Sequence, residues 1–482
     1  MQTSIVTVFE DLISTFQQED LHKRILNYLS VQQNGTIVNI KRYTAFSGLD
    51  EEVQQEFEQE TRSIREDYRR NTGTALYLLE SNLAVSHIEN AAKCSKADFE
   101  YLLAFADWLV VLQDAADTCF HIEFDLSISV DSEYKVDTII SEQASAQFGQ
   151  MLLRKYSSKD YRIKNDQTDI EFFKQALEAF KQDTTIDLGL LVSLANYMQL
   201  GIVQDGIANE IYPNVFKVDL SVLINKFNGI LEKPISDTQE IVKLVDFFTI
   251  DPASLKTLKG KPTDLLPIWE REKRNNCFTA KPILRIGNDC IFSPVSMHYV
   301  QTSWRSGITE WYPPYEIGLK NLCDVLAQWK KRYEDEMVQD IVQLFRYTNF
   351  DLVEPEIELY YRFPCDDYPE DLGDYDVLAI STERKEIWII ESKVLQKVGS
   401  IYEDQMQQKN FFYQGKYDEK FQKRIDYMTQ NVSKVLDSLG VEKDQFTVVP
   451  YMVTNKLFAS RYKKIHFPII SYSELQTLLN NL

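Results

Sequence analysis

The chain lacks the patterns that mark several common protein classes. No run of about 18 apolar residues occurs in its 482 residues, so we expect no contact with a membrane. The first ten residues have neither the basic start nor the apolar core of a secretory signal. Residues 1–320 contain no Gly-x-x-x-x-Gly-Lys-Ser/Thr sequence, so a P-loop nucleotide hydrolase is not indicated there.

Cysteine and histidine are both scarce, at six and five residues. The cysteines include no Cys-x-x-Cys pair, and the histidines are isolated except for His121, which lies two residues after Cys119. Structural zinc sites need two such ligand pairs, so a zinc site is not expected. Scattered cysteines are typical of reduced, buried thiols, and we therefore expect a cytoplasmic protein.

Basic residues are fewer than acidic residues. The chain has 52 Lys and Arg against 73 Asp and Glu, a net charge of −21. From residue 321 onward the count is 20 basic against 27 acidic residues, so neither part of the chain is basic as a whole. An acidic surface opposes contact with phosphates. If the chain acts on nucleic acid, we expect an oligomer or a partner protein to help it engage the substrate.

One apolar stretch of this acidic chain carries charges at its end. Residues 376–380 and 386–393 are predicted to be two strands, joined by a polar turn at 382–385. If the hairpin is symmetric about this turn, Asp376 lies directly across from Glu391. Lys393 is two residues further along and points to the same face. A one-residue bulge would change this register.

Two carboxylates and a lysine in one place suit phosphodiester hydrolysis. Carboxylate oxygens bind Mg²⁺ or Mn²⁺, which activate water and neutralise phosphate charge. A nearby lysine can orient or deprotonate the water, or stabilise the charge that develops on phosphorus. The alternative is an exposed Asp–Lys pair without a function.

The sequence Gly373-Asp374-Tyr375-Asp376 before the hairpin, with Glu391-Ser392-Lys393 at its end, resembles the core motif of the PD-(D/E)XK phosphodiesterase superfamily, the restriction-endonuclease-like nucleases. The resemblance implies that Asp376, Glu391 and the backbone carbonyl of Ser392 bind the metal, and that Lys393 is catalytic.

The family's first motif is a glutamate on a preceding helix, and Glu334 matches it best. Met337, Val338 and Ile341 follow Glu334 at helical spacing, so Glu334 is expected on the apolar face of its helix. Glu336 fits that face less well. The resemblance implies that Glu334 binds a second ion or orients water.

The order of the predicted elements also resembles the family's αβββαβ core. A helix at 322–346, a strand at 353–362, the hairpin, a helical region at 403–439 and strands at 446–454 and 465–471 are expected. The fold class is therefore α+β or α/β, in a multidomain chain. A mainly helical region with some strands, residues 1–320, would recognise, assemble or regulate; residues 321–482 would form the nuclease domain.

In the first region, apolar residues at helical spacing predict helical structure over 5–29, and β-branched and aromatic residues favour a strand at 36–43. A hairpin is predicted within 281–292, with its turn at 287–289.

These patterns predict a metal-dependent endonuclease that cuts double-stranded DNA, of the kind found in bacterial restriction or anti-phage defence. RNA or single-stranded DNA is the alternative substrate, and a non-catalytic assembly protein with a vestigial nuclease fold is the alternative function. Lys420, Lys423 and Arg424 are candidate phosphate contacts, or else an ordinary solvated helix face. A homo-oligomer is expected, because one site cuts one strand. Replacing Glu391 by alanine is expected to stabilise the metal-free protein by removing one of two facing carboxylates.

Overall fold

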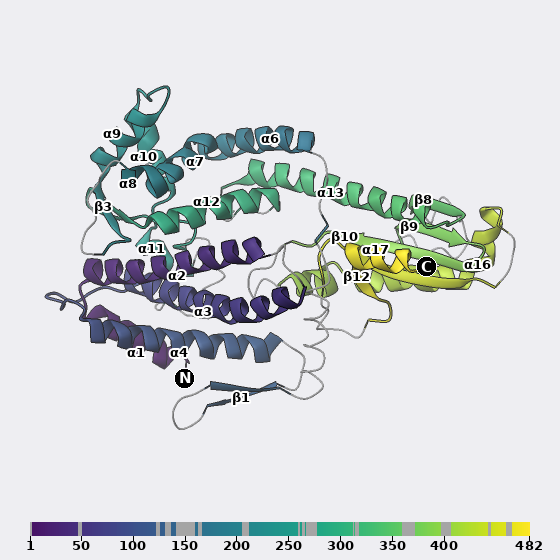
Figure 1. Cartoon of the computed structure of the whole chain (residues 1–482), viewed down its shortest axis with the longest axis horizontal. Coiled ribbons are helices and arrows are strands. Elements are labelled where there is room, and N and C mark those ends of the chain that lie inside the picture. Colours follow the sequence, from purple (N-terminus) through teal and green to yellow (C-terminus); the bar gives the residue numbers. More distant parts are fainter. Residues whose placement is uncertain are drawn as a thin grey trace. The chain divides into compact units, whose positions relative to one another are not determined.

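Figure 1 shows the computed structural model of the chain. It describes residues 2–46, 51–121, 126–130, 136–140, 160–161, 166–204, 212–258, 261–262, 266, 277–311, 313, 318–358, 372–396, 406–441, 445–458 and 465–482. Helices predominate in these residues, and their strands form one five-stranded, one three-stranded and two two-stranded sheets. The predicted mixture of helices and strands is therefore confirmed.

The chain folds into two compact units, each built from two stretches of sequence. The first comprises Met1–Asp114 and Phe173–Val325, and the second Ala115–Phe172 and Leu326–Leu482. The division predicted at residue 320 omits the segment 115–172 from the second unit. Tyr161 shows what holds part of this segment there, because its backbone N–H donates to the Asn455 carbonyl at 2.8 Å. Its ring centroid also lies 4.7 Å from that of Tyr472.

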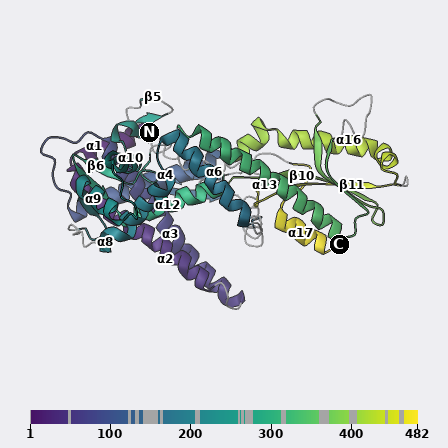
Figure 2. The same ribbon diagram turned by 90° about the horizontal axis from the view of Figure 1, so that it is seen from above.

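Four long helices begin in the first unit. They are α1 (Gln2–Ser14), α2 (Gln18–Phe46), α3 (Glu51–Ala84) and α4 (Lys96–His121). Phe9, Leu26, Tyr77 and Leu102, one from each helix, lie in the same buried core. Helices α2 and α3 run side by side, and Figure 2 shows the far end of this pair projecting from the other helices of its unit.

One prediction for this region is confirmed and one is wrong. The helical structure predicted over 5–29 is present, as two helices, because the backbone at Phe16 leaves α1 and forms a bridge with Ala92. The strand predicted at 36–43 lies inside α2. The β-branched and aromatic residues there favour a strand only weakly, and packing of α2 along α3 outweighs that preference.

Shorter helices and a small sheet complete the first unit. In chain order they are α6 (Asp166–Thr184), which enters this unit at Phe173, α7 (Leu188–Asn196), the π-helical turn η1 (Tyr197–Gly201), α8 (Ile202–Gln204), β3 (Phe216–Asp219), α9 (Leu220–Ile230), α10 (Thr238–Phe247), α11 (Pro252–Leu255), β4 (Thr257–Leu258), β5 (Lys261–Pro262), β6 (Leu284–Ile286), β7 (Asp289–Phe292) and α12 (Pro294–Thr309). The predicted hairpin at 281–292 is confirmed, since β6 and β7 pair antiparallel across Gly287 at φ +60°.

The second unit contains the five-stranded sheet. Its elements are β1 (Leu126–Val130), β2 (Val136–Ile140), α13 (Lys320–Tyr347), which enters this unit at Leu326, β8 (Leu352–Glu358), β9 (Asp374–Ser381), β10 (Glu386–Lys393), the π-helical turn η3 (Asn410–Gln414), α16 (Tyr417–Ser438), β11 (Thr447–Thr454), β12 (Ile469–Ser471) and α17 (Tyr472–Asn480). The strand order is β12-β11-β10-β9-β8. Strands β8, β9 and β10 are antiparallel, whereas β10, β11 and β12 are parallel.

Helices cover both faces of this sheet. Figure 2 shows α16 on one side and α13 with α17 on the other. On the α13 side, the ring of Phe345 packs 5.6 Å from that of Trp388. On the α16 side, Phe421 and Met428 share a core with Leu378 and Ile389 of the central strands. The site residues on β9 and β10 are thus held in a sheet packed between two layers.

The edge strand β8 carries charge and a proline. Pro355 lies opposite Val377 of β9 and has no backbone N–H, which is tolerated in edge strands. Glu356 and Glu358 are exposed, and Glu356 has φ +48°.

No single helix in the described ranges has the length and apolar composition needed to span a membrane. One bent pair, the segments Ile170–Thr184 of α6 and Leu188–Gln204, meets that criterion jointly, and its two parts meet at 93°.

Candidate active site

The hairpin β9–β10 has the register predicted from its symmetry. The pairs run from Ser381 opposite Glu386 to Val377 opposite Ile390. The next pair in this register would be Asp376 and Glu391, where the regular ladder ends. The two carboxylates therefore lie where β9 and β10 stop pairing with each other, while β10 stays paired with β11 and β9 with β8.

Beyond the last paired residues, the side chain of Asp376 accepts a hydrogen bond from the backbone of β10. Its carboxylate oxygen Oδ2 accepts the backbone N–H of Ser392 at 2.5 Å. The preceding Tyr375 donates its hydroxyl to the carbonyl of Arg424 in α16 at 2.7 Å. Gly373, with φ +69°, allows the chain to enter β9 in a conformation that other residues rarely adopt. The Gly373-Asp374-Tyr375-Asp376 sequence thus joins β9 both to β10 and to α16.

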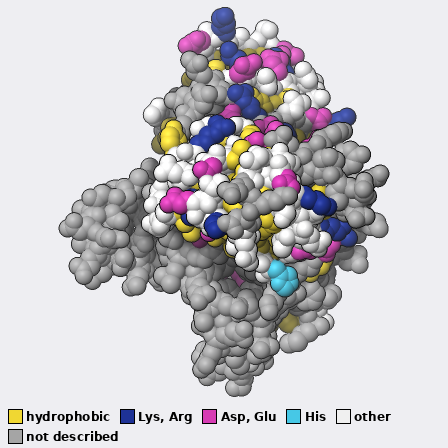
Figure 3. Space-filling model, turned by 90° about the vertical axis from the view of Figure 1, so that its right-hand side faces the viewer, with side chains coloured by type: hydrophobic (Ala, Val, Ile, Leu, Met, Phe, Trp, Pro, Cys, Tyr) yellow, Lys and Arg dark blue, Asp and Glu magenta, His cyan; other side chains and the backbone are white. Residues whose placement is uncertain are grey.

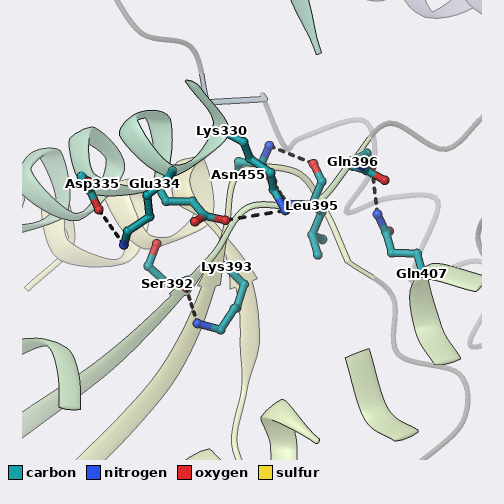
Figure 4. Close-up of polar contacts among 10 residues, drawn as sticks. Lys330, Glu334, Asp335, Ser392, Lys393, Leu395, Gln396, Gln407 and Asn455 are labelled. Carbon is teal, nitrogen blue, oxygen red and sulfur yellow. Dashed lines mark hydrogen bonds and ion pairs between the residues drawn. The ribbon is translucent and has the colours of Figure 1, made fainter. Parts of the chain in front are cut away.

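Glu391 is buried, with 3% of its surface exposed, and both of its oxygens face cations. Lys393 Nζ lies 2.8 Å from Oε1, and Arg424 Nη2 lies 2.8 Å from Oε2. Lys393 Nζ also donates to the carbonyl of Ser392 at 3.0 Å, as Figure 4 shows. The ring of Tyr417 lies 5.2 Å from the same ammonium.

Burial and the neighbouring charges shift the pKa values of two of these groups. Burial, together with the charge of Glu391, raises the pKa of Asp376 to about 7. Burial by itself would lower the pKa of Lys393, but attraction to Glu391 and Asp376 outweighs it and raises that pKa. Lys393 is therefore a cation at neutral pH in the metal-free protein. This favours a role in stabilising negative charge over a role in deprotonating water.

Glu334 stands apart from these three residues. It lies on α13 and forms an ion pair with Lys330 at 3.7 Å, with 35% of its side chain exposed. Figure 4 shows Glu334 reaching toward Lys330, while the ammonium of Lys393 points away from both. The apolar residues that placed Glu334 on the helix, Met337 and Ile341, are fully buried as expected. The neighbouring Glu336 pairs with Arg332 instead.

The three candidate phosphate contacts of α16 differ in exposure. Lys420 and Lys423 are exposed, whereas Arg424 is buried. Arg424 is therefore not a surface residue in this structure, and its role as a phosphate contact stays a prediction. Arg424 falls three residues after Phe421 and four before Met428, so it lies on the buried stripe of the helix. That spacing is the signal in the sequence that could have identified it as an internal residue.

Sequence reasoning also missed Asn455. Its side chain is buried, accepts the N–H of Leu395 at 2.7 Å and donates to the Leu395 carbonyl at 3.2 Å, as Figure 4 shows. The backbone pairing of β10 with β11 ends at Lys393 and Thr454. Just beyond it, the side chain of Asn455 links the two chains through these two bonds. Asn455 thereby fixes the chain that follows Lys393.

The donor atoms at the end of the hairpin are of the type that Mg²⁺ and Mn²⁺ prefer. They are the carboxylates of Asp376 and Glu391 and the carbonyl of Ser392. Glu391 Oε2 is buried and accepts no aligned hydrogen bond in the described part of the chain, although Arg424 Nη2 lies 2.8 Å from it. Within the same residues, no group of three or more His, Cys, Asp or Glu side chains is placed to hold a metal. Such an ion would therefore need further oxygen ligands from water or substrate.

The surface in Figure 3 shows basic and acidic side chains interspersed on the face that it presents. Among the described residues of that face, neither sign forms a continuous patch. Searches against protein-family models, curated proteins and solved structures found no match to this chain.

Proposed function

We propose that the chain is a metal-dependent nuclease, with double-stranded DNA as its first expected substrate and endonucleolytic cleavage as its reaction. The observation that carries this proposal is the convergence of Asp376, Glu391 and Lys393 at the end of one hairpin. Buried charges are costly, and a metal-dependent site is a reason to keep two carboxylates there.

The order of the elements in the second unit supports a PD-(D/E)XK domain. Helix α13, strands β8, β9 and β10, helix α16 and strand β11 follow one another as α, βββ, α and β. The two carboxylates lie on the second and third strands of this series. A role in bacterial restriction or anti-phage defence is the biological setting that this type of domain suggests.

Each site residue has a chemical role in this proposal. Asp376, Glu391 and the Ser392 carbonyl would hold Mg²⁺ or Mn²⁺, which would polarise the phosphate and lower the pKa of a bound water. Lys393, as a cation, would stabilise the charge that develops on the phosphate oxygens. The oxygen of water would form a new bond to phosphorus and give up a proton to solvent, the bond from phosphorus to the leaving deoxyribose oxygen would break, and that oxygen would take up a proton.

A non-catalytic assembly or binding protein is the second candidate, and two observations favour it. Both oxygens of Glu391 are neutralised by cations, and Glu334 pairs with Lys330 rather than with the site. On this alternative the charges at the hairpin end only hold β10 against α16.

A cleavage assay separates these functions. The protein would be incubated with supercoiled plasmid, linear duplex, single-stranded DNA and RNA, each with Mg²⁺, with Mn²⁺ or with chelator. Lys393→Ala tests the site, and Lys385→Ala, in the exposed turn of the same hairpin, is the matched control. We expect metal-dependent cutting of the plasmid by the wild type and the control but not by Lys393→Ala. Cutting of only RNA or only single-stranded DNA would identify that nucleic acid as the substrate instead. No cutting of any substrate would favour the non-catalytic assembly protein.

A further inference from the structure

Arg424 is a buried residue of α16 that contacts both strands of the candidate site, β9 and β10. Its Nη2 lies 2.8 Å from Glu391 Oε2, and its Nη1 donates to the carbonyl of Asp374 at the start of β9. The guanidinium also lies 5.7 Å from the ring of Phe421, and 6% of the residue is exposed. A phosphate contact on the surface would not be enclosed in this way.

The cationic groups of Arg424 and Lys393 contact the atoms that are expected to bind the metal. Arg424 faces Glu391 Oε2, and Lys393 contacts both Glu391 Oε1 and the Ser392 carbonyl. Together the two side chains carry two positive charges, the same as one Mg²⁺ or Mn²⁺ ion. A metal bound at Glu391 would meet strong repulsion from a guanidinium that remained in place.

The contact between Arg424 and Glu391 is close but poorly aligned. A strong arginine–carboxylate pair has two parallel hydrogen bonds. Here Glu391 Oε2 accepts no aligned hydrogen bond, and Arg424 Nε has no partner among the described residues, although both atoms are buried. Exchange of this cation for another therefore breaks no well-formed hydrogen bond at Oε2.

We propose that Arg424 is an internal counter-ion that competes with the divalent metal for Glu391. In the metal-free protein it neutralises the carboxylate, and it moves away from Oε2 when the ion binds. The inference rests on the proposed nuclease function, because it assumes a metal at Glu391. It assigns to Arg424 a weakening effect on metal affinity, the opposite of what a supporting residue would have.

Metal affinity measured without nucleic acid tests the proposal. Mn²⁺ would be titrated into the full-length protein, and free Mn²⁺ would be followed by electron paramagnetic resonance. Arg424→Gln is expected to lower the Mn²⁺ dissociation constant by about tenfold, because it removes the competing charge. Lys434→Gln removes the same charge from an exposed position of α16 and is expected to leave the constant unchanged. The gain should vanish in Arg424→Gln combined with Glu391→Gln.

Weaker or unchanged Mn²⁺ binding by a folded Arg424→Gln would overturn the proposal, since a residue that only supports the site gives that result. Arg424→Met keeps the apolar contact with Phe421 and serves if the glutamine variant does not fold.

The wild-type protein offers an independent measurement. Phenylglyoxal modifies accessible arginines, and peptide mass spectrometry would follow Arg424 beside Arg346, an exposed arginine of α13. Saturating Mg²⁺ is expected to accelerate modification of Arg424 several-fold and to leave Arg346 unchanged. An equal rate with and without bound Mg²⁺ would overturn the proposal.

Failure of this inference and failure of the nuclease function give different results. A wild type that cuts DNA with Mg²⁺ while Arg424→Gln binds Mn²⁺ no more tightly contradicts only the inference. Absence of both metal binding and cleavage in every variant contradicts the nuclease function as well.

Discussion

Glu391 is a buried carboxylate whose charge is balanced by two cationic side chains. If only the two facing carboxylates, Asp376 and Glu391, are considered, removal of Glu391 should relieve their repulsion and stabilise the protein. The structure reverses this expectation, because Lys393 and Arg424 would lose their anion. Breaking one side of a buried ion pair leaves a charge without compensation and is strongly destabilising.

Glu391→Ala is therefore expected to lower the free energy of unfolding of the metal-free protein by about 3–5 kcal/mol. Urea denaturation in the presence of chelator measures this change. Glu383→Ala, in the exposed turn of the same hairpin, is the control and should change stability by about 0.5 kcal/mol or less. A glutamate-to-alanine variant at 391 that is more stable than the wild type would mean that the repulsion dominates.

Asp376 gives the metal-free second unit an unusual pH dependence. Its pKa is raised from 3.8 to about 7 by burial and by the charge of Glu391, so the folded state holds the proton more tightly than the unfolded chain does. The stability from this group is complete below about pH 4 and is lost as the pH rises through 7. Between those values, the melting temperature in chelator should contain a component that falls with rising pH.

Asp376→Asn should remove that component, because the amide does not titrate. Thermal unfolding of both proteins from pH 5 to pH 8 makes the comparison. A slope that is the same in the variant would assign the pH dependence to other groups.

At the scale of elements, the hairpin β9–β10 could be predicted because its information is local. Apolar strands with a polar turn define both its ends and its register, and the structure has that register. The strand predicted at 36–43 fails for the opposite reason, since only packing against α3 decides that α2 continues there. Likewise, no local pattern reveals that Tyr161 bonds to Asn455.

The candidate site divides in the same way. Asp376, Glu391 and Lys393 come from one hairpin and could be placed together from sequence. Arg424 comes from a helix after an intervening segment, and its charge predicts exposure unless the apolar stripe around it is considered. Glu334 has the expected place on its helix, but side-chain pairing with Lys330 is not encoded in that helical spacing alone.

Asn455 provides a test at this scale, because it links the ends of β10 and β11. Asn455→Ala leaves the buried N–H and carbonyl of Leu395 without these bonds and should cost about 2 kcal/mol, at about 1 kcal/mol for each bond. Chemical denaturation measures the loss. Asn431→Ala, which removes one side-chain bond within α16, is the control and should cost less. Equal losses would argue against a linking role.

At the scale of the whole molecule, the two units should respond to acid in opposite directions. His22 lies in the core of the first unit, fully buried, and neither ring nitrogen has a hydrogen-bond partner in the described residues. Burial lowers its pKa from 6.5 to about 3. The unfolded chain therefore binds a proton that the folded unit excludes, so this stability is present above pH 6.5 and is lost as the pH falls toward 3.

We expect calorimetry of the metal-free protein at pH 5 and pH 7.5 to reveal this difference. The transition of the first unit should move to lower temperature at pH 5, while the contribution of Asp376 stabilises the second unit. His22→Leu should reduce the acid sensitivity of the first transition without affecting the second. Acid sensitivity that persists in this variant would exclude His22 as its main source.

The edge strand β8 bears on how copies of the protein can associate. An open sheet edge offers its backbone to strands of other chains, which is a route to aggregation. Pro355 lacks an N–H, Glu356 interrupts the extended backbone, and Glu356 and Glu358 bring negative charge. Another copy of β8 would meet like charges and a missing donor, so edge-to-edge fusion is disfavoured even in concentrated solution. If the proposed nuclease acts as a dimer, we therefore expect the dimer to form through other surfaces.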